Sequence, residues 1–128
     1  MITATLRHFA LTELSHPELI ANDCAVWLDD IRDLCGFPLT VTSAARTPEE
    51  NAALPGSSPT SLHLSGRAFD LAWIGDPAER WRFVEAVSLA SGERAVELEF
   101  VPFGNNRHLH IALHANDGHH STLLFSEA

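Results

Sequence analysis

Residues 61–70, Ser-Leu-His-Leu-Ser-Gly-Arg-Ala-Phe-Asp, constrain the fold more than any other stretch, because they place an imidazole and a carboxylate on either side of a glycine. His63 and Asp70 are seven residues apart, which on one continuous α-helix would be about 10 Å of rise. Two ligands of a single zinc ion must each approach it to about 2 Å. If these side chains share a metal ion, the segment is not helical and turns near Gly66, where a left-handed backbone costs little.

The residues after this turn predict a β-strand over 67–73, because large and small side chains alternate along it. Alternate residues of a strand point to opposite faces of the sheet. Phe69, Leu71 and Trp73 would share one face, and Asp70 would lie between alanines on the other. The pattern predicts a carboxylate on the small-residue face of a strand that otherwise packs through large apolar side chains.

Periodicity and turn residues predict the other elements. We expect helices over 17–35, 48–54 and 77–90, each with proline at its first position. We expect strands over 39–43, 95–101 and 107–114, and residues 122–125 could add an edge strand. The alternating segments 95–101 and 107–114 flank a turn and predict an antiparallel hairpin. Helices and short strands in mixed order predict an α+β fold with a mostly antiparallel sheet and helices packed on it.

The length of 128 residues predicts one domain over 1–128, long enough to bury a core. A formal net charge of −9 disfavours sequence-independent nucleic-acid binding, because the electrostatic contribution would be repulsive. No apolar run approaches the roughly 20 residues that a membrane span needs. The first residues lack the basic and apolar pattern of a signal peptide, so we expect synthesis in the cytoplasm.

Two cysteines, Cys24 and Cys35, fall on the first predicted helix. Their separation along the helix axis would be about 16 Å, which is too far for a disulfide between them. We expect both to be buried free thiols.

The segment 61–70 has specific neighbours: Ser-Ala-Ala-Arg-Thr-Pro at 43–48 precedes it and Arg-His-Leu-His-Ile at 107–111 follows it. With the opening residues 6–14, this ordered set resembles the M15 family of zinc D,D-carboxypeptidases and peptidoglycan endopeptidases over residues 6–113. It is most similar to the small, phage-associated, endolysin-like branch. The resemblance implies a hedgehog- and DD-peptidase-like fold, Zn²⁺ as cofactor and the peptidoglycan stem peptide as substrate.

The resemblance implies three zinc ligands, His63, Asp70 and His110, with an open coordination position for water. His110 matches the last family ligand because apolar residues flank it, whereas His108 stands where many relatives carry an aromatic residue. Without the resemblance, the three side chains are more simply separate surface or capping residues.

Glu99 is the first candidate for the general base, which moves a proton to the leaving amine. It corresponds to the glutamate of an acidic-Phe segment in the relatives. In the predicted hairpin it can share a face with His108 and His110. A structural role for Glu99 stays open, and His108 is the second candidate, as a proton shuttle.

Arg46 corresponds to the arginine of the family through its Ser-x-x-Arg-Thr-Pro setting. The resemblance implies that its guanidinium binds a substrate carboxylate or the carbonyl oxyanion. The alternative is a helix-capping salt bridge to Glu49 or Glu50. Ser61 is expected to hydrogen-bond Asp70 or the loop backbone.

Four further polar residues receive no catalytic role. We expect surface positions for three histidines beyond the matching region, and a contribution to solubility from one acidic residue: His114, His119, His120 and Glu97.

The residues and the resemblance together predict a monomeric zinc metallopeptidase that hydrolyses a stem-peptide bond by metal-activated water. The bond is D-Ala–D-Ala or L-Ala–D-Glu, and the protein would act on the cell wall after release. One alternative is a module that holds zinc and wall peptide without cutting, such as a structural part of a phage particle, because residue 107 is not acidic. Another is a cytoplasmic dipeptidase.

Overall fold

The computed structural model describes residues 1–115 and 120–125 and has the α+β architecture that the sequence predicts. The helices of this part of the chain are α1 (Asn22–Cys35), α2 (Pro48–Ala53) and α3 (Pro77–Ser91). The strands are β1 (Val41–Ser43), β2 (Ala68–Ala72), β3 (Val96–Val101), β4 (His108–Leu113) and β5 (Thr122–Leu124). Short 3₁₀ turns cover Leu11–Glu13, Pro17–Leu19 and Gly104–Asn106.

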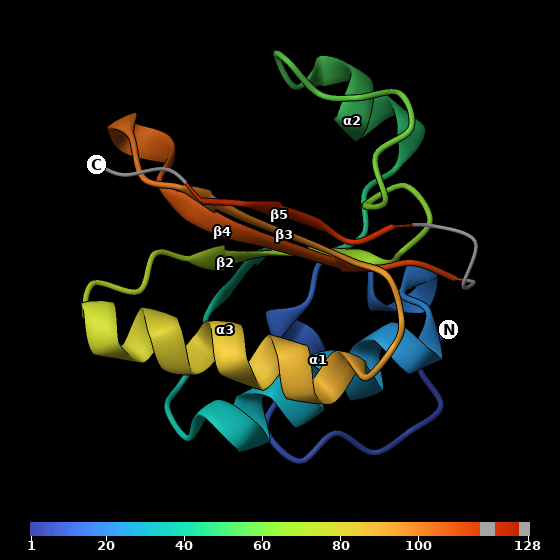
Figure 1. The fold of residues 1–128 in the computed structure, drawn as a ribbon. Helices are drawn as coiled ribbons and strands as arrows, with labels where there is room; N and C mark the ends of the chain where they lie inside the picture. Colours follow the sequence, from blue (N-terminus) through green and yellow to red (C-terminus); the bar gives the residue numbers. More distant parts are fainter. Residues whose placement is uncertain (116–119, 126–128) are drawn as a thin grey trace.

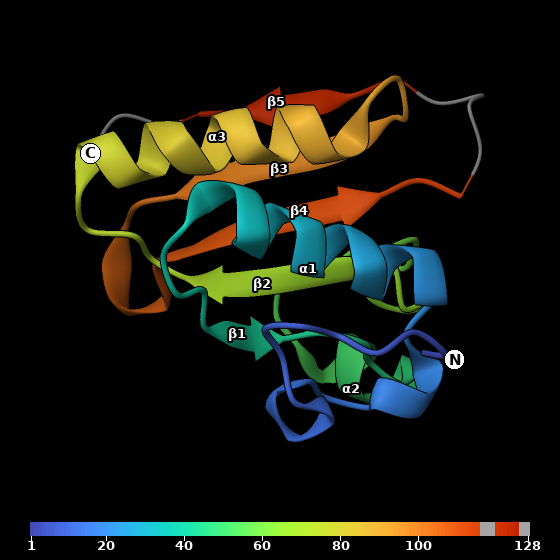
Figure 2. The same cartoon turned by 90° about the horizontal axis from the view of Figure 1, so that it is seen from below.

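The strands form one sheet in the order β1-β2-β4-β3-β5. Neighbouring strands are antiparallel except β3 and β5, which pair in parallel. Helices α1 and α3 pack on one face of the sheet, and α2 stands beyond the other face (Figure 1). Figure 2 shows the two long helices lying over the sheet, with their axes roughly along the strands. One face of the sheet is therefore closed by helices.

The hydrophobic core fills the space between the sheet and these two helices. The large side chains of the two central strands are fully buried there: Phe69, Leu71, Leu109 and Ile111. Because side chains alternate along a strand, the polar residues between them, Asp70 and His110, lie on the opposite face. The alternation predicted for residues 67–73 thus separates the core from the polar face of the sheet.

The long helix predicted to begin at position 17 is interrupted before α1. Pro17–Leu19 form a 3₁₀ turn, and Ile20 is extended and fully buried. The cause is a tertiary contact: the N–H of Ala21 donates to the carbonyl of Gly66 at 3.0 Å. Gly66 has a φ of +68°, and a Cβ added there would lie 1.9 Å from the carbonyl oxygen of Leu19. The turn predicted near Gly66 is confirmed, and its close packing explains the break.

Other local predictions are confirmed with adjusted bounds. β1 spans fewer residues than the predicted 39–43. The hairpin of β3 and β4 forms, with Glu99 opposite His110. Cys24 and Cys35 lie in α1 as buried free thiols. Among the helices of the described residues, none combines the length and apolar character needed to span a bilayer.

Candidate metal centre

His63 lies on the loop between α2 and β2, and contacts with the chain just after β1 fix its position. Its carbonyl accepts a hydrogen bond from the N–H of Arg46 at 3.0 Å. Its Nδ1 donates to the carbonyl of Ala44 at 2.5 Å. The ring is only 2% exposed, so it has little freedom to turn. With Nδ1 donating, the lone pair of Nε2 points toward Asp70.

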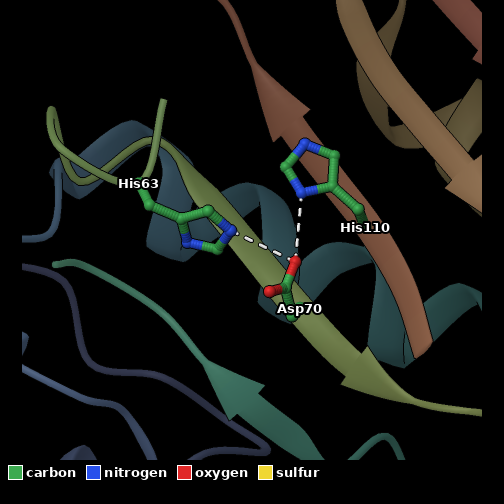
Figure 3. A group of neighbouring side chains, drawn as sticks. All are labelled: His63, Asp70 and His110. Atoms are coloured by element: carbon green, nitrogen blue, oxygen red, sulfur yellow. Dashed lines mark hydrogen bonds and ion pairs between the residues drawn. The ribbon is translucent and has the colours of Figure 1, made fainter. Parts of the chain in front are cut away.

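Asp70 and His110 face each other on the central strands β2 and β4, whose register pairs them directly. Figure 3 shows the side chains of His63, Asp70 and His110 pointing toward one another from a loop and two strands. Oδ1 of Asp70 lies 3.1 Å from Nε2 of His63 and 3.0 Å from Nδ1 of His110. A loop, the strand that follows it and a strand distant in sequence therefore meet at one oxygen atom.

The three ligand atoms have the spacing and chemistry that one metal ion requires. They lie within 4.8 Å of one another, and ligands about 2 Å from a tetrahedral zinc ion are about 3.3 Å apart. Nε2 of His110 donates to Oε1 of Glu97 at 2.8 Å, which turns the Nδ1 lone pair toward Asp70. Two nitrogen lone pairs and a carboxylate oxygen thus face one another. Such an arrangement favours a cation between them, so these residues could hold a metal ion.

A proton on Nδ1 of His110 can supply the positive charge next to Asp70 in place of a metal ion. Burial by itself would lower the pKa of His110, but the hydrogen bonds to Asp70 and Glu97 outweigh it and raise this pKa to about 9. Burial would raise the pKa of Asp70, but the neighbouring imidazoles of His110 and His63 hold it well below its ordinary value. The pKa of Glu97 is lowered, mainly by its hydrogen bond to His110.

Arg46 lies beside the proposed ligands. It hydrogen-bonds Asn51 and Asp70 rather than the glutamates of the helix-capping alternative. Nη1 donates to Oδ1 of Asn51 at 3.1 Å, and Nη2 donates to Oδ2 of Asp70 at 3.2 Å. Asn51 is itself buried and donates to the carbonyl of Ser58 at 2.9 Å. Glu50 instead closes the capping box of α2 with Thr47. The guanidinium is therefore held against the carboxylate of Asp70.

An open cleft of about 320 Å³ lies over the group, on the sheet face away from α1 and α3. Glu99 and His108 line it together with Arg46 and the three proposed ligands. Nδ1 of His108 donates to the carbonyl of Asn106 at 2.6 Å. The structure brings together all six predicted site residues, and their individual roles stay predictions.

Glu97 is the site residue that the sequence reasoning missed, because it was assigned to solubility. The signal was present in the alternation of residues 95–101, which puts Glu97 and Glu99 on the same face of the hairpin as His110. Of the two partners expected for Ser61, the structure shows the loop backbone: its Oγ accepts from the N–H of His63 at 3.2 Å.

Two of the remaining histidines can be placed. His120 is exposed, and His114 follows β4 outside the converging group. His119 lies outside the described residues.

A comparison with protein families agrees with this geometry. The model of a family described as Peptidase M15 matches residues 8–112, a span that contains every proposed site residue. No curated protein matches the chain.

Proposed function

Because the chain belongs to the M15 family of zinc-dependent metallopeptidases, we propose that it hydrolyses a peptide bond in the stem peptide of peptidoglycan. The bond is D-Ala–D-Ala, as in a D,D-carboxypeptidase, or L-Ala–D-Glu, as in an endopeptidase. The observation that carries the proposal is the meeting of His63, Asp70 and His110 at the floor of an open cleft. An acidic residue, Glu99, also lines that cleft.

His63, Asp70 and His110 would hold the zinc ion. When bound, zinc polarises a carbonyl group and lowers the pKa of a coordinated water toward about 7. The backbone carbonyl of Ala44 orients the ring of His63, and the strand register of β2 and β4 orients the other two side chains. These supports arrange the ligand atoms before any substrate arrives.

Glu99 takes the proton of the attacking water and returns it to the leaving amine. It stands directly opposite His110 in the β3–β4 pair and lines the cleft. His108, at the start of β4, lines the same cleft and is the second candidate for this proton transfer.

Arg46 binds the substrate from the α2 side of the cleft. A guanidinium carries five N–H donors, and the bonds to Asn51 and Asp70 engage Nη1 and Nη2 through one contact each. Its other donors are available to a substrate carboxylate or to the carbonyl oxygen that gains charge in the transition state. The protein would reach this substrate after release from the cell that makes it.

The test is digestion of purified peptidoglycan by the zinc-loaded protein, followed by mass spectrometry of the muropeptides. Release of D-alanine from pentapeptides would identify a carboxypeptidase, and new amino groups on D-glutamate would identify an endopeptidase. Asp70→Ala is the control for contaminating hydrolases. Unchanged muropeptides would instead identify a binding module, and cleavage limited to a free dipeptide would identify a dipeptidase.

A further inference from the structure

We propose that Glu97 is a positioning residue that fixes the ring of His110 and strengthens its Nδ1 as a metal ligand. This inference rests on the proposed function, because it takes His110 to be a ligand. Glu97 belongs to β3, whereas the three proposed ligands come from a loop, β2 and β4. It therefore adds a fourth chain segment to the site.

The contact is made on the side of the imidazole that faces away from Asp70. Nε2 of His110 donates to Oε1 of Glu97 at 2.8 Å, while Nδ1 lies 3.0 Å from Oδ1 of Asp70. With both ring nitrogens engaged, the tautomer and the ring plane are determined together. The side chain of His110 is 17% exposed and that of Glu97 is 33% exposed, so the bond is partly shielded from water.

The strand register explains why Glu97, rather than Glu99, makes this bond. Glu99 is the direct partner of His110 across β3 and β4, and Glu97 is paired with Ala112. Glu97 thus reaches His110 along the diagonal, a distance that long side chains can cover. The small side chain of Ala112 leaves room for this approach. The two glutamates on this strand face would then have different roles: Glu97 would orient a ligand and Glu99 would transfer protons.

The two proposed histidine ligands differ in the support that each receives. The outer nitrogen of His63 donates to a neutral backbone carbonyl, that of Ala44, whereas the outer nitrogen of His110 donates to a carboxylate. A carboxylate partner raises the basicity of a metal-bound imidazole, and loss of such partners weakens metal binding by about 10- to 100-fold. We therefore expect the metal affinity of His110 to depend on its bond to Glu97, and not only on the strand geometry that positions its ring.

The experiment compares zinc affinity, by competition with a chromophoric chelator, in the wild type, Glu97→Ala and Glu97→Gln. Glu97→Ala should bind zinc about 10- to 100-fold more weakly. Glu97→Gln should lie between it and the wild type, because the amide oxygen accepts the bond without the charge. The visible spectrum of the Co²⁺-loaded protein should shift in Glu97→Ala. Glu85→Ala, on the exposed face of α3, is the matched control for loss of one negative charge.

Wild-type zinc affinity in Glu97→Ala, with or without lower thermal stability, would overturn the inference and reduce Glu97 to a strand-pairing residue. If Glu97→Ala does not fold, Glu97→Leu replaces it, and equal zinc affinities of the Leu and Gln variants would overturn the inference equally. These measurements use no substrate. Failure to digest peptidoglycan would therefore count against the proposed function while leaving the role of Glu97 to be judged by metal affinity.

Discussion

Replacing Gly66 with alanine should lower the free energy of unfolding by about 3 kcal/mol or more, the sum of three effects. An L-residue in the left-handed region costs about 1–2 kcal/mol, and Gly66 has a φ of +68°. The added Cβ would lie 1.9 Å from the carbonyl oxygen of Leu19 and 2.9 Å from Cα of Ile20. Both neighbours are backbone atoms, so the segments must separate. Separation loses the bond from Ala21 to Gly66, worth about 1 kcal/mol, and disturbs the buried Ile20.

The assay is urea unfolding of the metal-free protein, with Gly36→Ala as the matched control. Gly36 ends α1 with a φ of +78°, and nothing lies within 4 Å of an added Cβ. Gly36→Ala should therefore lose only the conformational part, about 1–2 kcal/mol. The reasoning is refuted if the two variants lose the same free energy at equal slopes of the unfolding transition, because the packing of Gly66 would then contribute nothing.

Three further predictions concern the site and the pH dependence of stability. His63→Ala and Asp70→Ala should each abolish zinc retention after gel filtration, and a variant that keeps stoichiometric zinc would remove its residue from the ligand set. Glu99→Gln should keep zinc and lose about 100-fold or more in peptidoglycan turnover; undiminished cleavage would assign the base role elsewhere. The hydrogen bond from Arg67 lowers the pKa of Asp23 from 3.8 to about 2. The contribution of the Asp23–Arg67 contact to the stability of the fold is therefore present above about pH 4 and lost as the pH falls toward about 2. In urea titrations the destabilisation by Asp23→Asn should shrink over that range, and a constant difference would contradict this assignment.

The alternation of core-facing and polar side chains along the strands was the sequence pattern that best predicted the site. The period of two in residues 67–73, 95–101 and 107–114 separated core-facing from polar side chains without knowledge of the fold. The predicted hairpin put Glu99 on a face that it can share with His108 and His110, and the structure pairs Glu99 directly with His110. A metal ion shared by His63 and Asp70 would require a chain reversal between them, and Gly66 marked the position where that reversal costs least.

The features that the sequence did not reveal depend on contacts between distant segments. Alternation assigned Glu97 to a face but could not determine which of two glutamates would bond His110. The break before α1 follows from the packing of Ile20 and Ala21 on Gly66. This is a tertiary contact, and the helical periodicity of the sequence cannot predict it. The partners of Arg46 were also undetermined, because nearby glutamates offered an equally plausible local salt bridge.

The position of Arg46 limits how Asp70 can bind an ion. A carboxylate can coordinate through one oxygen or through both. Oδ2 of Asp70 is engaged by Arg46, and Oδ1 faces the two imidazoles. If Asp70 holds a metal ion, Oδ1 would be the oxygen that faces it, while Oδ2 stays bonded to Arg46. Arg46 would then hold the carboxylate of Asp70 in place, and its substitution should weaken metal binding as well as any contact with substrate.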